Sequence, residues 1–137
     1  MGTTNVDALA VSGIALNPNE YQILTHYIAG TQTAAAKKVS FLVPFAATIA
    51  DVRAYLDTAP TGAAFVLDVN LNGTTVFTTQ GNRPTIAISG NASTTTLPDV
   101  VSVAAGDRIT VDVDVIGSSV AGSDLSIAIA LKRQHPA

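Results

Sequence analysis

One short run of oxygen-bearing side chains has the spacing of a calcium loop. Asp68, Asn70 and Asn72 stand at alternate positions, and Gly73 follows them directly. In such a loop the oxygens converge on one ion, and a bidentate glutamate six residues after the glycine completes the coordination. That position holds Thr79. The run is better explained as the outward-facing polar row of a β-strand that leads into a hairpin turn.

A second group of carboxylates, Asp112, Asp114 and Asp124, would bind a hard cation only if a loop carbonyl joined them. Asp112 and Asp114 alternate with valines, which is the pattern of a strand with one face in solvent. Acid–base catalysis by two carboxylates requires both to converge in one cleft, and nothing in this spacing brings them together. We therefore assign no catalytic residue, metal ligand or cofactor to this group.

Histidine offers the remaining acid–base chemistry, and the chain has only His26 and His135. His135 is close to the C-terminus, where chains commonly fray. His26 falls in an alternating segment on the face opposite Tyr21 and Tyr27, so we expect an exposed or interface imidazole rather than a catalytic base. Motifs of serine hydrolases, zinc proteases and phosphate-binding loops do not occur. The sequence predicts that the protein is not an enzyme.

Composition restricts the partners. Of the 137 residues 12% are charged, and the formal net charge is −3, so the chain lacks the basic surplus that binds nucleic acid. No stretch approaches the roughly 20 apolar residues that span a bilayer, so no membrane partner is expected. A surface with so few charges resists association weakly, which favours a homo-oligomer. The absence of cysteine excludes disulfides and thiolate metal sites.

The elements that must position these residues are β-strands, because apolar side chains recur at every second position along most of the chain. The alternation is clearest in residues 21–27, 65–71, 109–115 and 125–131. Residues 39–43 alternate too, as do residues 50–56, with Ala50, Val52, Ala54 and Leu56 on one face. Weaker strand segments are 85–88 and a threonine-rich run ending at Leu97-Pro98. About eight short strands separated by turns predict an all-β fold, a two-sheet antiparallel sandwich that is jelly-roll-like.

Two strand pairs are predicted from the connections. Asn72-Gly73 suits a type I′ turn, because both residues tolerate a positive φ, so residues 74–79 should return beside 65–71 as a hairpin. The strands 109–115 and 125–131, joined by a loop rich in glycine and serine, are predicted to form the second pair. Residues 33–38 have helix propensity but are too few to form a stable helix, so a flexible connector is predicted there.

The first twenty residues differ from the rest. Residues 6–16, VDALAVSGIAL, are apolar without a clean period, and Asn17-Pro18-Asn19 interrupts the chain before the first predicted strand. We therefore divide the chain into an N-terminal arm, residues 1–20, and a jelly-roll β domain, residues 21–137. The arm is expected to pair at a sheet edge or to lie on a neighbouring subunit.

Residues 39–77 and 106–131 resemble a small jelly-roll module of tailed-bacteriophage virion proteins. The resemblance rests on turns and strand ends in a fixed order, namely Val43-Pro44-Phe45, Thr61-Gly62-Ala63, Asp68 to Gly73, Gly106-Asp107-Arg108 and Gly117 to Gly122. It implies a structural virion protein, a capsid cement or decoration protein that coats or stabilises a phage head. By this implication the protein is a homotrimer on the outer capsid surface, and its N-terminal arm ties it to the major capsid protein or to its neighbours.

The same resemblance leaves an alternative, a receptor- or glycan-binding module of a phage tail fibre or baseplate appendage. Sugar sites usually present exposed aromatic platforms, so this alternative requires that a tyrosine such as Tyr55 is exposed. Packing of the tyrosines in the core or in an interface is the competing interpretation.

Overall fold

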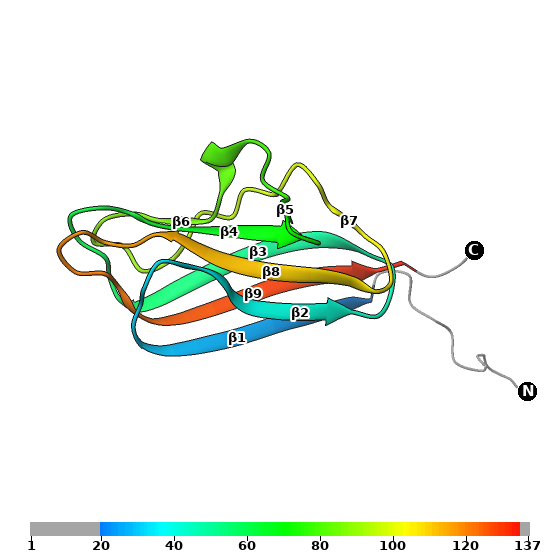
Figure 1. The fold of residues 1–137 in the computed structure, drawn as a ribbon, viewed down its shortest axis with the longest axis horizontal. Coiled ribbons are helices and arrows are strands. Elements are labelled where there is room, and N and C mark those ends of the chain that lie inside the picture. The colour runs from blue at the N-terminus through cyan, green and yellow to red at the C-terminus, as the bar shows by residue number, and fades with distance from the viewer. Residues whose placement is uncertain (1–19, 135–137) are drawn as a thin grey trace, which may run out of the picture.

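Alternating apolar residues fold the chain into two antiparallel sheets that face each other. The computed structural model describes residues 20–134. Within them the strands are β1 (Tyr21–Thr31), β2 (Ala35–Val43), β3 (Ala47–Thr58), β4 (Phe65–Leu71), β5 (Thr74–Thr75), β6 (Thr85–Ile86), β7 (Ser102–Val103), β8 (Asp107–Val115) and β9 (Ser123–Arg133), with a short 3-10 turn, η1 (Gln80–Asn82), after β5. The all-β, two-sheet antiparallel sandwich predicted from the sequence is confirmed (Figure 1).

The strands alternate between the two sheets along the chain. One sheet has the order β1-β9-β3-β7, and the other has the order β2-β8-β4-β5, with β6 also paired to β4. Apart from the segment from β4 to β6, each strand lies in the sheet opposite its predecessor. With β6 set aside, eight strands in two sheets connected in this way are jelly-roll-like.

This alternation corrects one predicted pair, because β8 and β9 are not neighbours. β8 pairs with β2 and β4, whereas β9 pairs with β1 and β3 in the other sheet. The loop between them crosses the sandwich. The apolar row of each strand shows which face is buried. Two strands with such rows can share the same core either as neighbours in one sheet or as members of the two opposite sheets. Sequence alternation therefore could not separate the two arrangements.

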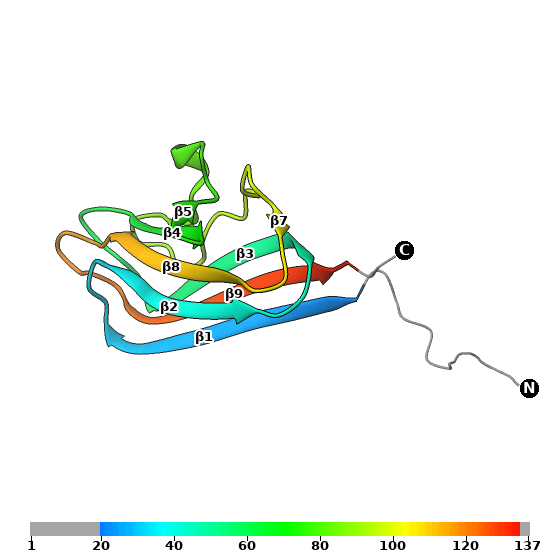
Figure 2. The ribbon, with the colours of Figure 1, turned by 45° about the vertical axis from the view of Figure 1, so that its right-hand side comes forward.

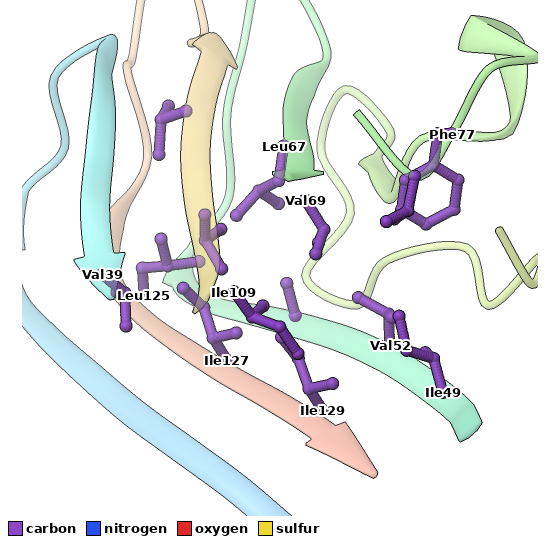
Figure 3. Packing of buried hydrophobic residues seen from close by; sticks show 14 of the residues in the cluster. Val39, Ile49, Val52, Leu67, Val69, Phe77, Ile109, Leu125, Ile127 and Ile129 are labelled. Atoms are coloured by element: carbon purple, nitrogen blue, oxygen red, sulfur yellow. The ribbon is translucent and has the colours of Figure 1, made fainter. Parts of the chain in front are cut away.

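The core lies between the sheets and consists of the inward side chains that the alternation predicted (Figure 3). Each of them is at most 3% exposed on the three central strands. They are Leu125, Ile127, Ile129 and Leu131 on β9, Ile109, Val111 and Val113 on β8, and Phe65, Leu67 and Val69 on β4. Full burial of one such side chain stabilises the folded state by roughly 1.5–3 kcal/mol.

The predicted hairpin forms, but its second strand is shorter than expected. Asn72 and Gly73 have φ values of 51° and 90°, as the predicted turn requires. Only Thr74 and Thr75 then pair with β4 as β5. The next residue but one, Phe77, is fully buried and belongs to the core (Figure 3). The prediction of a strand over 74–79 is wrong beyond Thr75, because burial of Phe77 takes the chain out of the sheet.

The predicted connector at residues 33–38 is also wrong, because β2 begins at Ala35. Lys37 interrupts the strand with a φ of 54°, and its N–H donates to the Asp112 Oδ1 atom at 2.8 Å. The pairing with β8 shifts register between Ala35 and Val39. A bulge of this kind hides a strand from an alternation pattern, since the residues before it change face.

Two further segments differ from the prediction. In β3 a register shift between Ile49 and Asp51 places Ile49 rather than Ala50 in the core beside Val52, and Ala50 is half-buried. The segment 85–88 is a strand only over Thr85–Ile86, and the threonine-rich run after it forms isolated bridges instead of a strand.

The first and last described strands bring the two ends of the described chain together. The Arg133 N–H donates to the Glu20 carbonyl at 2.8 Å, and the two side chains form an ion pair at 3.9 Å. We call this end of the sandwich the terminal pole (Figure 2). The predicted arm lies outside the described residues except for Glu20, and so does His135. No helix within residues 20–134 is long and apolar enough to cross a membrane.

Candidate functional site

The outer face of the sheet β1-β9-β3 contains a shallow trough whose floor is β9. Outward positions on β9 alternate with the buried Ile127 and Ile129, and they hold small side chains, Ser126, Ala128 and Ala130. Larger side chains project from the two neighbouring strands. The difference in side-chain length hollows the surface along β9, and the hollow has a volume of about 640 Å³.

Two tyrosines face each other across this floor in a single cross-strand row. Tyr27 on β1 and Tyr55 on β3 are both register partners of Ser126. Tyr27 is 54% exposed and Tyr55 is 47% exposed. Two strand spacings of about 4.8 Å place their Cα atoms about 10 Å apart. A flat ring stacked between two others needs about 7–8 Å, so the row suits one planar ring between the tyrosines.

The next row of the trough adds hydrogen-bonding groups. Thr25 and Arg53 are the register partners of Ala128 on either side, and both line the hollow. The Arg53 guanidinium is held by the Asp51 carboxylate on the same strand, and two-thirds of the Arg53 side chain remains exposed. A hydroxyl and a partly neutralised guanidinium therefore flank the apolar floor beside the tyrosine pair.

The far rim of the trough is the segment around Ser93. The Ser93 N–H donates to the Ala54 carbonyl at 2.9 Å, and the Ala54 N–H donates to the Ser93 hydroxyl, also at 2.9 Å. Asn91 fixes the same segment, because its side-chain amide donates to the Leu56 carbonyl at 2.7 Å. Ser93 and Thr95 both line the hollow from this side. The rim is thus anchored to β3 by both backbone and side-chain hydrogen bonds.

Tyr27 is oriented by a carboxylate outside the trough. Desolvation of its hydroxyl and the hydrogen bond to Asp124 raise the pKa of Tyr27 above 10.0. The Asp124 Oδ1 atom also accepts the Gly30 N–H at 2.7 Å, which fixes the carboxylate between the two. Tyr27 is therefore neutral, and Asp124 orients its hydroxyl.

The residues of the calcium-like run lie on β4 and its turn, in the other sheet. Asp68 was expected to face solvent, but it is only 7% exposed. Its Oδ1 atom accepts the Thr75 hydroxyl at 2.7 Å and the Val69 N–H at 2.9 Å. Burial raises the pKa of Asp68, an effect that the Thr75 and Val69 hydrogen bonds oppose. The prediction of an exposed Asp68 is wrong, because the hairpin return folds over it.

The rest of the run serves the hairpin and its neighbours. The Asn70 side-chain amide donates to Asp112 at 2.8 Å. The Asn72 side chain donates to Asp107 at 3.0 Å and accepts the Arg108 N–H at 3.0 Å. These hydrogen bonds connect β4 and its turn to β8, so Asn70 and Asn72 have a structural role.

The second acidic group is not brought together by the fold. Asp112 and Asp114 lie on β8, whereas Asp124 lies on β9 in the other sheet. Each has a different partner: Asp112 accepts the Lys37 N–H, Asp114 forms an ion pair with Arg83 at 2.7 Å, and Asp124 holds Gly30. Among the described residues no group of three or more acidic or histidine side chains is placed to hold a metal ion.

His26 is exposed, as the sequence predicted. It is the register partner of Ile127, whose side chain lies in the core, so the imidazole projects from the face opposite Tyr27. The pairing of Tyr27 with Tyr55 was not predicted. Tyr55 could be placed on an outward position from the alternation, but Tyr27 belongs to the apolar row that was expected to be buried. Only the pairing of β1 and β3 with β9 brings the two tyrosines into one row.

Comparisons of the chain with protein-family models, with curated proteins and with solved structures find no match.

Proposed function

We propose that this protein is a structural virion protein of a tailed bacteriophage, a cement or decoration protein that coats or stabilises the phage head. It binds the major capsid protein on the outer capsid surface as a homo-oligomer. The jelly-roll-like strand order agrees with the fold that this resemblance implies. Its role in this proposal is contact rather than catalysis.

The observation that carries the proposal is the outer face of the sheet β1-β9-β3. Tyr21, Ile23, Tyr27 and Tyr55 project there with about half of each side chain exposed, beside the small residues of β9. Exposed apolar and aromatic side chains that gather on one face mark surfaces that gain stability when another macromolecule covers them. Of the carboxylates near the trough, Asp51 is paired with Arg53, Asp124 is bonded to Tyr27, and Asp57 is exposed on β3.

The terminal pole supports an attachment through the N-terminal residues. Glu20 and Arg133 are bonded neighbours there, so residues 1–19 join the sandwich at the pole and not at its middle.

The test is the location of the protein on purified virions. A cement protein is expected in high copy number on a stained gel and as regular density on the outer shell by electron microscopy. Deletion of residues 1–18 is expected to leave the β domain folded but unable to bind capsids. A truncated protein that still decorates shells normally would refute the role of the arm, and a low copy number at the tail would refute the cement role.

A second candidate is glycan or receptor recognition by a tail appendage, and the tyrosine row favours it. The exposure of Tyr55 meets the condition that this alternative required. A sugar ring between Tyr27 and Tyr55 would stack on both aromatic faces, while Thr25, Arg53 and Ser93 lie near enough to line the same hollow. Binding of the purified chain to a panel of bacterial surface glycans tests this function directly.

A further inference from the structure

Most sheet edges in the described part of the chain offer little backbone to a partner. In the sheet β1-β9-β3-β7 one edge is β7, and in the other sheet one edge is β5. Each of these strands contains two residues. Very short edge strands are one of the ways in which proteins prevent sheets from pairing edge to edge.

The edge formed by β2 is longer, but it is protected in another way. Lys37 has a φ of 54°, and the register with β8 shifts between Ala35 and Val39. Lys37 and Lys38 also place two positive charges at this point. A bulge and lysines on an edge strand both oppose the addition of a further strand.

The edge formed by β1 has none of these protections. β1 contains 11 residues, YQILTHYIAGT, with no charged residue and no proline. Its register against β9 is unbroken from Tyr21 to Ile28. It is the outermost strand of its sheet in both views (Figures 1 and 2). Among the described residues no strand pairs with its second side.

The backbone of β1 presents a regular set of donors and acceptors to this open side. The Arg133 N–H donates to the Glu20 carbonyl, so these opposed residues form a hydrogen-bonded pair. Such pairs alternate along an antiparallel ladder, which directs the N–H and C=O groups of Gln22, Leu24 and His26 toward β9. The groups of Tyr21, Ile23, Thr25 and Tyr27 point the other way. These four residues carry the exposed outward side chains of the strand as well.

We propose that the open edge of β1 is an interface between two copies of this chain, in which the two β1 strands pair antiparallel about a twofold axis at Leu24. The partner is a second copy because the strand is self-complementary: it carries no charge, so an isologous contact brings no like charges together. The two sheets join into one continuous sheet that includes β3, β9 and β1 of both copies.

The side chains select the register. With the axis at Leu24, Tyr21 lies opposite Tyr27 of the second copy, Ile23 lies opposite Thr25, and on the inner face the half-buried Leu24 meets its own counterpart. Gln22 then lies opposite His26, so polar faces polar. An axis at Thr25 would oppose Ile23 to Tyr27, but it would also oppose the apolar Leu24 to His26 and Gln22 to the apolar Ile28. Cross-strand aromatic and apolar pairs stabilise a sheet, and the Leu24 register has more of them.

The test measures the mass and the amide exchange of the purified full chain. The expected mass is twice the 14.0 kDa of the monomer. In wild-type protein the amide protons of Ile23, Thr25 and Tyr27 are expected to be protected, and dilution should remove their protection while Leu24 and His26 stay protected. Thr25→Lys places a charge at the centre of the interface and should weaken dimerisation by about tenfold or more. Thr96→Lys, at an exposed position away from β1, is the matched control.

Each contrary outcome overturns the proposal. A monomer whose Ile23, Thr25 and Tyr27 amides exchange rapidly shows an edge without a partner. A monomer in which they are protected shows that residues 1–19 of the same chain cover the edge. A trimer excludes the twofold pairing. If Thr25→Lys fails to fold, Ile23→Pro is the second variant. It removes an outward N–H and leaves the bonds to β9 in place, so it too should weaken dimerisation. None of these results depends on binding to virions, so failure here would leave the capsid proposal standing.

Discussion

Tyr27 and Tyr55 lie on opposite sides of Ser126 in one cross-strand row, with about half of each side chain exposed. The pair exists because β9 separates β1 from β3 and has a small residue at that position. Its chemistry suits a flat ring with hydroxyl groups at the edge, whether that ring belongs to a sugar or to a side chain of another protein.

Tyr55→Ala should remove one of the two aromatic rings that border the trough, and it should leave the fold intact. If the trough binds a glycan, loss of one aromatic face should reduce affinity by about tenfold, which corresponds to roughly 1.4 kcal/mol. Titration of wild-type and variant chains with the same glycan measures the difference. Ile88→Ala is the control, because Ile88 is also about half exposed but does not line the hollow. Equal losses in both variants would contradict a specific role for the trough.

Asp68 should make stability depend on pH. Its pKa in the folded state is raised by burial, so between the ordinary value of 3.8 and the folded-state value the folded chain binds more protons than the unfolded chain. The contribution of this group to the free energy of unfolding therefore falls as pH rises through that window. Above the window Asp68 is ionised in both states, and the full cost of burying its charge lowers the stability. Asp68→Asn, which keeps an oxygen for Thr75, should be more stable than wild type at pH 7 and should lose this advantage at pH 3.

The difference between variant and wild type is the readout for Asp68, because other carboxylates act in the opposite direction. The hydrogen bond from the Thr79 N–H lowers the pKa of Asp99, and the Asn72 amide lowers the pKa of Asp107. Their stabilisation is present above pH 3.8 and is lost as pH falls through the folded-state pKa. Asp57→Asn removes an equal charge from an exposed position and serves as the control. A wild-type chain that gained stability over Asp68→Asn with rising pH would contradict the assignment.

Alanine substitutions of Leu56 and Leu42 compare how much a buried and an exposed leucine contribute to the stability of the sandwich. Leu56 is fully buried on β3, whereas Leu42 is 73% exposed on β2. Leu56→Ala should reduce the free energy of unfolding by about 2–5 kcal/mol through lost burial and a residual cavity. Leu42→Ala should change it by less than about 0.5 kcal/mol. Urea unfolding of both variants compares them, and similar losses would mean that the two sheets do not pack as described.

Gly117 should tolerate no side chain. A Cβ atom at this position would overlap the Val120 carbonyl oxygen and would lie 2.9 Å from both the N and O atoms of Thr61. Because these neighbours are backbone, the crossing loop between β8 and β9 would have to move, at a cost of about 3 kcal/mol or more for Gly117→Ala. Gly81→Ala meets nothing within 4 Å and should melt close to wild type. Thermal melts of the two variants test the contrast.

The sequence predicted the buried face of β4, β8 and β9, because their apolar residues recur at every second position. It did not do so for β1, since the row of Tyr21, Ile23 and Tyr27 is exposed, whereas Leu24 and Ile28 pack against the core. Leu125, Ile127 and Ile129 are inward as expected, and Asn72-Gly73 makes the expected turn. The sequence did not predict which strands are neighbours. The pairing of β9 with β1 and β3 depends on contacts between residues about 65 to 110 positions apart, such as Ile49 with Leu131 and Tyr21 with Lys132, and no local pattern encodes them.

The candidate site was missed for the same reason. Tyr55 was singled out as a condition for glycan binding, but its relation to Tyr27 needs the register of three strands. The irregular segment around Ser93, which forms the far rim, has no periodic pattern and is held by side-chain bonds to Ala54 and Leu56. The burial of Asp68 likewise follows from the return of Thr75 and Phe77, which leave the ladder that the alternation suggested.

The bonded ends at the terminal pole determine how the domain would respond to force. Because β1 and β9 are antiparallel neighbours, pulling Glu20 away from Arg133 would load the hydrogen bonds between them one after another, as in opening a zipper. Pulling the loops at the far end against Glu20 alone would instead load the bonds along the length of β1 together. Held by one terminus, the sandwich therefore meets mechanical stress in its strong direction.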